Sequence, residues 1–313
     1  MRRGRRYSHF TMVEMLLVVS IIGILVGMTF PAISMARERA KYMRAIAFNA
    51  QINRDPDALI NYNFEAPDYT VKYKGRYRAA LYNGAAGCVA NGYNPTDYSG
   101  ILMNMSYVNP NTNPVQSSPE WVSGGGRWKF KNALLFNGTT DYVFIPGTYN
   151  TNFDPSKDDF SVAMWVKFNV FSGDQYLFGK SRALTGNNSQ YNVNIRANRR
   201  IRTCFGGKNK AWTSPLPEVR MWYHVAVVNR AGKAVECYLN GKLMGPTAVS
   251  VPSNKMIQAF MNIGAYSNNG KNPFEASAGM RNYFNGFMDE FVMYNRALSA
   301  KEIEGHYKMG TPY

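Results

Sequence analysis

Histidine, cysteine and acidic residues are scarce in this chain. Its 313 residues contain three histidines and three cysteines, and 20 Asp or Glu stand against 36 Lys or Arg, a formal charge of +16. Neither the histidines nor the cysteines have the spacing of metal ligands, which argues against a zinc site. The residues concerned are His9, His224, His306, Cys88, Cys204 and Cys237.

The odd number of cysteines leaves two interpretations open. In an exported protein one disulfide forms and one thiol is left over, and Cys204 and Cys237, each in an expected strand, are then the favoured pair. The other interpretation is that all three cysteines are small buried apolar residues.

The positive charge is concentrated near the start of the chain. Residues 1–54 hold nine Lys or Arg against two acids, and the other residues hold 27 against 18. A nucleic-acid-binding protein needs a basic face on its folded domain. The later basic residues are scattered, so nucleic acid is not an expected partner; the one run is Arg196, Arg199, Arg200 and Arg202.

Charged residues are absent from residues 15–33. As a helix this run would span about 28 Å, at about 1.5 Å per residue, which is enough to cross a bilayer. Four arginines at 2–6 precede it, so the positive-inside rule predicts a cytoplasmic N-terminus, although basic residues at 37–44 weaken this argument. A cleaved signal peptide would be shorter, with small residues at the cut. We therefore expect a single-pass inner-membrane anchor and an exported C-terminal domain, in the periplasm or at the cell surface.

Glu14 lies near the start of the apolar run, where a carboxylate in hydrocarbon is costly unless a partner neutralises it. The segment resembles the N-terminus of type IV prepilins and pseudopilins in its basic leader, Phe10, Thr11, Glu14, Gly23 and Pro31. The resemblance implies that a prepilin peptidase cuts between His9 and Phe10 and that the new amine of Phe10 is methylated. It also implies that Glu14 pairs with the N-terminal amine of a neighbouring pilin-like subunit during assembly.

The residue before the implied cut departs from the family pattern. The family has glycine there, whereas this chain has His9, and Gly4 is too far upstream to serve. The alternative is an uncleaved signal anchor in which Glu14 sits near the membrane interface.

Small and apolar residues continue at helical spacing through residues 32–54, as expected for a helix that leaves the membrane. The sequence Asp-Pro-Asp-Ala at 55–58 breaks this pattern. We therefore expect a leader at 1–9, a transmembrane and stalk helix at 10–54, and a separate domain at 55–313.

From residue 58 onward, short runs alternate apolar with polar residues and are bounded by Gly, Asn or Pro. Each run is typical of a half-buried strand. So many strands, with no long helical pattern between them, predict a mainly β fold in which two antiparallel sheets pack face to face.

Five phrases resemble, in order, the laminin-G-like jelly-roll domains of the concanavalin-A-like lectin/glucanase superfamily, and the match covers roughly residues 58–308. The phrases are ALLFNGTTDYVFIP, FSVAMWVKF, WYHVAVV, VECYLNGKL and FNGFMDEFVMYNRALSAKEIEGHY. The resemblance implies that Trp165 and Trp222 lie in core strands. Trp212, in the segment KNKAWTSP, is expected in a loop and is the candidate for an exposed ligand contact.

The resemblance also implies a structural calcium ion, since Ca²⁺ prefers six to eight oxygen ligands. Asp289 is the favoured ligand, with Glu65 and Asp141 as helpers. The alternative is that Asp289 and Asp141 hold turns by hydrogen bonds.

Catalytic carboxylates are not evident. Glycoside hydrolases with this sandwich carry a Glu-x-Asp-x-x-Glu strand, which places acid and nucleophile on one face about 5 Å apart. No such pattern occurs, and neighbours such as Asp289 and Glu290 are expected on opposite faces of a strand. We therefore expect no enzymatic activity.

Two functions stay open. One is an anchored lectin-like domain that binds carbohydrate or a cell-surface protein. The other is a structural minor pilin or pseudopilin with no ligand of its own, since a sandwich of this kind does not fix a function.

Overall fold

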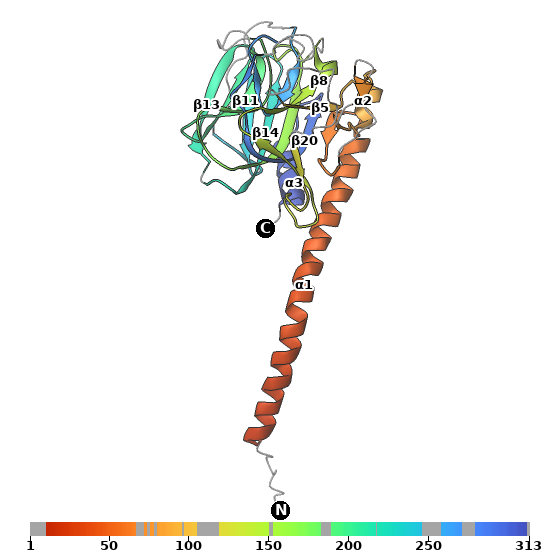
Figure 1. Ribbon diagram of the computed structural model, residues 1–313, viewed down its shortest axis with the longest axis vertical. Helices are drawn as coiled ribbons and strands as arrows, with labels where there is room; N and C mark the ends of the chain where they lie inside the picture. Colours follow the sequence, from red (N-terminus) through yellow and green to blue (C-terminus); the bar gives the residue numbers. More distant parts are fainter. Residues whose placement is uncertain are drawn as a thin grey trace, which may run out of the picture.

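A long helix carries a two-layer β-sandwich in the computed structural model (Figure 1). The structure describes residues 11–66, 72–73, 76–77, 80–95, 97–104, 119–149, 153–182, 189–216, 218–245, 258–270 and 279–311. The expected mainly β fold, with two antiparallel sheets behind a long N-terminal helix, is confirmed.

Helix α1 (Met12–Arg54) begins at a capping box. The Glu14 carboxylate accepts from the backbone N–H and the hydroxyl of Thr11, both at 2.8 Å, which satisfies groups that a helix N-terminus leaves unpaired. The 18-residue window that is apolar enough to span a membrane has none of its residues buried. Among the described residues, α1 packs on the sandwich through its C-terminal part, where Ala45, Asn49 and Ile52 are buried.

The first sheet, sheet A, has eight antiparallel strands. Seven of them lie side by side in one hydrogen-bonded order, and the eighth, β1 (Ala58–Tyr62), pairs with β20 outside this order. The order is β16 (Lys242–Leu243), β15 (Ala234–Leu239), β14 (Trp222–Arg230), β9 (Phe160–Phe168), β20 (Asn285–Tyr294), β7 (Ala133–Asn137) and β6 (Glu120–Val122).

The second sheet, sheet B, also has eight antiparallel strands. Its order is β13 (Lys208–Pro215), β12 (Arg200–Phe205), β11 (Ser189–Ile195), β10 (Gln175–Ser181), β17 (Met261–Ile263), β8 (Asp141–Ile145), β5 (Gly100–Asn104) and β4 (Ala80–Leu81).

Smaller elements complete the described part of the chain. Two short antiparallel pairs are formed by β2 with β3 and by β18 with β19. These elements are β2 (Lys72–Tyr73), β3 (Arg76–Tyr77), β18 (Tyr266–Ser267), β19 (Met280–Arg281), α2 (Ala86–Ala90), the 3-10 turn η1 (Pro146–Thr148) and α3 (Ala300–Gly310).

The main core lies between the two sheets and follows the alternation of side chains along each strand. In β14, Tyr223, Val225 and Val227 belong to this core, whereas Ala226 and Val228 belong to a separate cluster on the outer face of sheet A. Each sheet therefore has one face in the core and one outer face.

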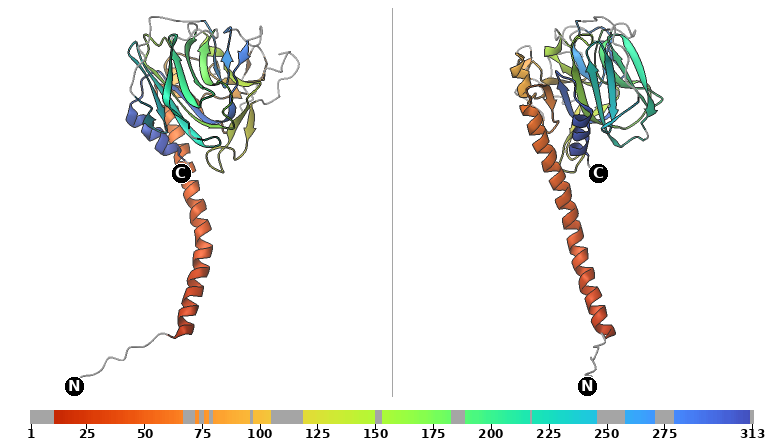
Figure 2. Two further views of the ribbon diagram at one scale, coloured as in Figure 1. Left: turned by 90° about the vertical axis from the view of Figure 1, so that its left-hand side faces the viewer. Right: turned by 180° about the vertical axis from the view of Figure 1, so that it is seen from behind.

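The outer face of sheet A is covered by the end of α1 and by α3. Ile52 of α1 and Ile303 of α3 are buried in one cluster with Tyr294 of β20, and the Phe48 ring meets the His306 ring edge-on at 4.9 Å. Figure 2 shows α3 beside the upper end of α1, at the base of the sandwich. The long helix is thus held by one sheet, and β11 and β13 of the other sheet lie away from it (Figure 1).

Candidate functional site

A buried ion pair lies where the sandwich meets α1. The Arg127 side chain donates from Nε to Asp289 at 2.9 Å, and neither side chain is exposed to solvent. The guanidinium lies between the rings of Trp128 and Trp165, 4.7 and 4.5 Å from their centroids. Burial on its own lowers the pKa of Arg127, but attraction to Asp289 and Glu290 outweighs it, so the group is held charged.

Lys131 joins two further carboxylates to this pair, Glu65 at 2.6 Å and Glu290 at 3.7 Å from its ammonium. The same ammonium lies 3.0 Å from Asp289. Burial lowers the pKa of Lys131, and attraction to Asp289 and Glu290 raises it by more, so the net shift is upward. The group of Arg127, Lys131, Glu65, Asp289 and Glu290, called the junction cluster here, balances two cations against three acids.

A β-bulge brings two adjacent acids of β20 to the same side. The pairing with β9 slips between Asp289 and Phe291, and Glu290 has a positive φ of 66°. The core residues of β20 accordingly change phase, from Met288 before the bulge to Phe291 after it. Both carboxylates then reach Arg127, Glu290 at 2.7 Å. The expectation that Asp289 and Glu290 point to opposite faces is therefore wrong, because the extra residue resets the alternation.

The implied calcium ligands do not fit a calcium ion in this arrangement. Asp289 and Glu65 do come together, but Lys131 lies between them and Arg127 holds Asp289, so ammonium and guanidinium groups already occupy both carboxylates. Among the described residues, no three His, Cys, Asp or Glu are grouped in a way that could hold a metal.

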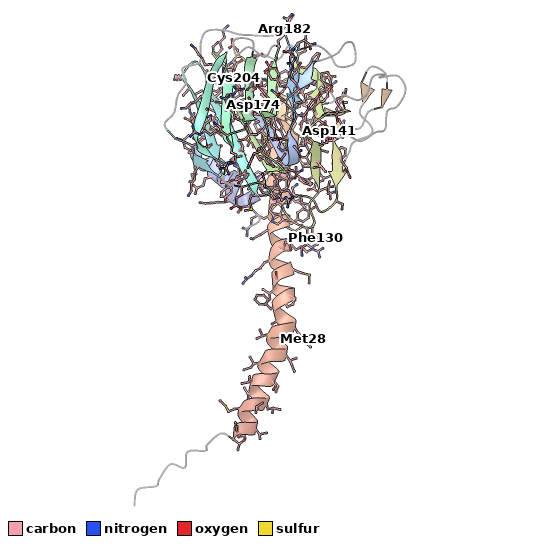
Figure 3. The ribbon with its side chains drawn as sticks, turned by 60° about the vertical axis from the view of Figure 1, so that its left-hand side comes forward. Met28, Phe130, Asp141, Asp174, Arg182 and Cys204 are labelled. Atoms are coloured by element: carbon pink, nitrogen blue, oxygen red, sulfur yellow. The ribbon has the colours of Figure 1, made fainter. Side chains whose placement is uncertain are left out.

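Asp141 lies apart from the junction cluster. Its carboxylate accepts from the backbone N–H of Asn137 at 3.0 Å and from the side-chain amide of that residue at 2.9 Å. These bonds close the turn between β7 and β8. Figure 3 shows Asp141 on the sandwich well above Phe130, which lies beside α1 in the loop that carries the cluster.

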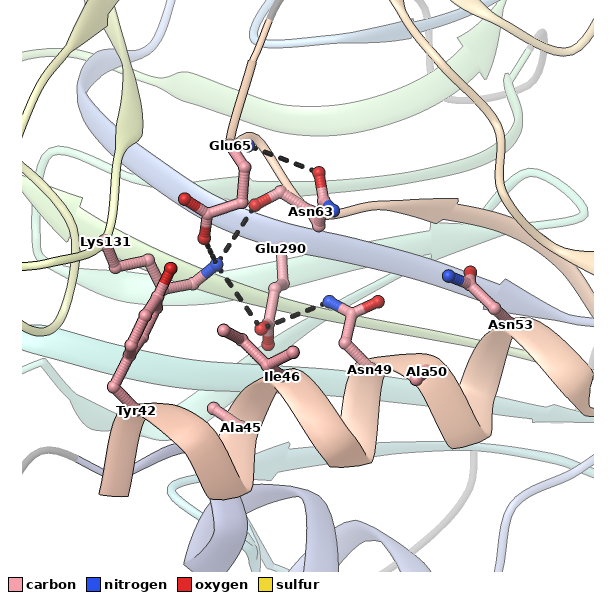
Figure 4. Close-up of a pocket in the computed structure, with 10 residues that line it drawn as sticks. All are labelled: Tyr42, Ala45, Ile46, Asn49, Ala50, Asn53, Asn63, Glu65, Lys131 and Glu290. Atoms are coloured by element: carbon pink, nitrogen blue, oxygen red, sulfur yellow. Dashed lines mark hydrogen bonds and ion pairs between the residues drawn. The ribbon is translucent and has the colours of Figure 1, made fainter. Parts of the chain in front are cut away.

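A small cavity of about 160 Å³ separates α1 from the junction cluster (Figure 4). The Asn49 amide donates to Glu290 at 3.4 Å across it, and Asn61 of β1 donates to both Asn49 and Asn53 of the helix. The helix is thus docked by amide groups as well as by apolar contacts. The lining residues are Tyr42, Ala45, Ile46, Asn49, Ala50, Asn53, Asn63, Glu65, Lys131 and Glu290.

Trp212 is buried, so its predicted exposure is wrong. The segment KNKAWTSP forms the edge strand β13, and the Trp212 side chain points into the core, where it is 1% exposed. Its indole N–H donates to the Thr203 hydroxyl at 3.2 Å, and the Lys210 ammonium lies 4.2 Å from the ring centroid. A lysine-rich segment is typical of a loop, but lysines also occur on edge strands, where they prevent pairing with another chain.

The three cysteines and His224 lie in buried positions, and His306 is partly buried. Cys88, Cys204 and Cys237 are buried free thiols, in agreement with the second interpretation of the cysteines. Burial lowers the pKa of His224 and lowers that of His306 to about 4. Both histidines are therefore neutral at pH 7.

The implied processing site is only partly described. His9 and Phe10 lie outside the described residues. Glu14 is described, and its carboxylate caps its own helix through Thr11.

On the outer face of sheet B, polar side chains form two rows across the strands. In the first row Asn192 of β11 and Asn262 of β17 flank Gly179 of β10. A Cβ atom at Gly179 would lie 2.6 Å from the Cβ of Asn192, so the close approach of these strands requires glycine. In the second row Asn194 lies between Tyr176 and Arg202.

Several of these amides are buried without complete hydrogen bonding. Asn192, Asn194 and Asn262 are at most 3% exposed. Within the described residues, no hydrogen-bond partner is present for the Asn192 Oδ1, Asn194 Nδ2 and Asn262 Oδ1 atoms. A buried polar atom left unpaired costs about 1–3 kcal/mol, so each is a place where water or a ligand gains a hydrogen bond. We call Asn192, Asn194, Asn262, Tyr176 and Arg202 the amide site.

Comparison with known proteins identifies the family of the domain. Residues 137–304 match the model of the concanavalin A-like lectin/glucanases superfamily, which is more than half of the chain. The chain belongs to this superfamily. The resemblance noted in the strand phrases is thereby confirmed for residues 137–304. No curated protein matches the chain.

Two solved structures illustrate the shared fold. Domain 4 of AbnA, a GH43 extracellular arabinanase from Geobacillus stearothermophilus in complex with arabinotriose, is 16% identical, with a TM-score of 0.50 over 80% of this chain and 98% of that chain. A Trypanosoma rangeli sialidase in complex with sialic acid is 14% identical, with a TM-score of 0.50 over 82% of this chain. This chain spans only 33% of the sialidase. At these identities the likeness concerns the fold alone.

One signal for the amide site is present in the sequence. In YNVNIRA the outer-face positions of the strand are asparagines, not charged residues. Asparagine is rare in strands, so a strand with asparagines along its polar face indicates that these amides have a role other than strand formation. What the sequence does not reveal is that the neighbouring strand β17 contributes another asparagine to the same row.

Proposed function

We propose that the chain is a membrane-anchored, exported protein whose sandwich binds carbohydrate through the amide site on the outer face of sheet B. The observation that carries this proposal is the set of buried amides with unpaired atoms at Asn192, Asn194 and Asn262. An asparagine side chain both donates and accepts, which suits it to the hydroxyl groups of a sugar.

Two further features support a saccharide as the ligand class. Aromatic rings lie at the same site, with Tyr176 and Tyr266 4.6 Å apart between centroids, and such rings offer an apolar body with a polar tip. In addition, the arabinanase domain with this fold is described in complex with arabinotriose.

The pairing of the two adjacent acids of β20 with cations favours a binding role over catalysis at this place in the described structure. Asp289 and Glu290 do share one side of β20, but Arg127 and Lys131 neutralise them inside the junction cluster. Both carboxylates are therefore already paired with buried cations and are not free to act on a substrate.

Helix α1 supports the anchor. Its apolar window has no packing partner within the described chain, and the four arginines before it favour a cytoplasmic N-terminus. We propose that the first residues stay in the cytoplasm, that the helix crosses the inner membrane once, and that α3 and the sandwich lie outside. The prepilin-like features extend this to cleavage before Phe10 and to pairing of Glu14 with other pilin-like subunits.

The binding proposal is tested with the full chain in detergent micelles on a glycan array. The Asn192→Leu and Asn262→Leu variants should lose glycan binding. The matched control is Asn229→Leu, because Asn229 is equally buried but bonds Pro155 and Asp158 away from sheet B. Glycan binding that survives in both site variants, or an array with no signal for the wild type, would contradict the proposal and leave the structural pilin-like role.

The anchor is tested in membrane vesicles. We expect the chain to stay in the membrane on alkaline extraction and the sandwich to be open to protease only from the exported side. Replacing Glu14 with Ala should leave the anchor in place and remove only incorporation into an assembly. A chain released by alkaline extraction would refute the anchor.

A further inference from the structure

The rim of the amide site carries an excess of positive charge. At the end of the hairpin formed by β11 and β12, Arg196 and Arg202 share one carboxylate, Asp174, at 3.7 Å from each. Arg200 is exposed and lies two residues from Arg202 on the same strand, so the two side chains share the outer face. Among the described residues, Arg196, Arg200 and Arg202 therefore outnumber Asp174, the acid with which two of them pair at this end of sheet B.

Arg202 joins this rim to the buried amides. Its Nε donates to Asn194 Oδ1 at 3.1 Å, and its Nη2 donates to the Tyr176 hydroxyl at 3.2 Å. These two bonds fix the plane of the guanidinium, and the side chain keeps 21% of its surface exposed. Its distance of 3.7 Å from Asp174 is longer than that of a charge-assisted hydrogen bond, about 2.7–2.9 Å. Arg202 is therefore oriented but incompletely neutralised.

We propose that the amide site takes an acidic saccharide, in which a carboxylate or sulfate group meets Arg200 and Arg202 while ring hydroxyls pair with the asparagine amides. This inference rests on the proposed carbohydrate-binding function and names the ligand class of the same site. A planar guanidinium matches the two oxygens of a carboxylate or sulfate better than it matches the hydroxyl groups of a neutral sugar.

The surroundings favour an acidic saccharide over nucleic acid. A nucleic acid needs a basic face that follows several phosphates, whereas Arg196, Arg200 and Arg202 lie together at one end of sheet B. Further along the same outer face the side chains are apolar, in the cluster of Ile101, Met103, Tyr142, Phe144 and Phe260.

The experiment measures binding of the full chain in micelles to heparin as the sulfated probe, polygalacturonate as the carboxylated probe and dextran as the neutral one. We expect the acidic probes to bind more tightly than dextran, and their binding to weaken as salt rises from about 50 to 300 mM because ions screen exposed charges. The Arg200→Gln and Arg202→Gln variants should each bind the acidic probes about tenfold more weakly. Arg39→Gln on the exposed stalk changes the net charge equally and should bind as the wild type.

Each outcome separates this inference from the function on which it rests. If dextran binds as tightly as the acidic probes and the arginine variants match the wild type, the acidic class is wrong and the carbohydrate function stands. If duplex DNA displaces heparin at lower concentration than polygalacturonate does, the partner is nucleic acid and the inference falls. If none of the probes binds and the glycan array is also empty, both proposals fail. Preference between heparin and polygalacturonate identifies the acidic group.

Discussion

The junction cluster should make Asp289 one of the most stability-sensitive positions of the sandwich. The Asp289→Asn substitution keeps the shape of the side chain and removes its charge. Arg127, with no exposed side-chain surface, and Lys131, 3% exposed, then lose their shared partner.

The size of the effect follows from the contacts that remain. Removing one partner of a buried ion pair costs about 3–5 kcal/mol, because a charge is left buried and uncompensated. Arg127 keeps Glu290 at 2.7 Å and Lys131 keeps Glu65 at 2.6 Å, so we expect the lower end, about 3 kcal/mol. With an m-value of about 3 kcal/mol per molar urea, the unfolding midpoint would fall by about 1 M.

The assay is urea unfolding of the full chain in micelles, followed by tryptophan fluorescence, with calcium and with chelator. The matched control is Glu304→Gln, whose carboxylate forms an exposed pair with Lys308 and should leave the midpoint close to that of the wild type. The double variant Asp289→Asn with Lys131→Met should lose less stability than the two single losses together, because it also removes one of the stranded cations.

Two results would refute this reasoning. One is a midpoint for Asp289→Asn within 0.2 M, about 0.6 kcal/mol, of the wild type, at the m-value given above. The other is a wild-type midpoint that chelator lowers and a variant midpoint that chelator does not change. That second pattern would mean that Asp289 holds calcium.

Three more outcomes are expected. Trp212→Ala should lower the free energy of unfolding by about 3–5 kcal/mol, as for other buried aromatics, and a loss below about 1 kcal/mol would mean that the ring is not in the core. The His306 pKa is lowered to about 4 by burial, so as the pH falls the unfolded chain takes up this proton at a higher pH than the folded chain does. The free energy of unfolding should therefore fall as pH drops from about 6.5 to 4, by up to about 3 kcal/mol. His306→Gln should flatten this part of the pH profile. In buffer without reductant, a thiol reagent should label all three cysteines after unfolding in urea and none in the folded chain. Fewer than three labels in urea would reveal a disulfide.

Much of the fold was predictable because its signals are local. The alternation in FSVAMWVKF and WYHVAVV sets which side chains face the core, and both phrases form strands with that pattern, β9 and β14. The Ser299 and Glu302 capping box in the last phrase likewise marks the start of α3. The buried position of Trp212 was not predictable, because a lysine-rich edge strand and a polar loop look alike in sequence.

The sequence by itself determined the apolar helix, the sandwich and the family to which it belongs, since each depends on periodicity over a few residues. Only the tertiary structure decided how the charged and amide groups combine. Arg127 and Asp289 are 162 positions apart and meet through sheet packing, and the bulge at Glu290 turns an adjacent acid to the same side. The amide site likewise exists only because β10 places Gly179 between two strands that each contribute an asparagine. Contacts across strands depend on sheet order and register, and neither is encoded by the pattern of any one strand.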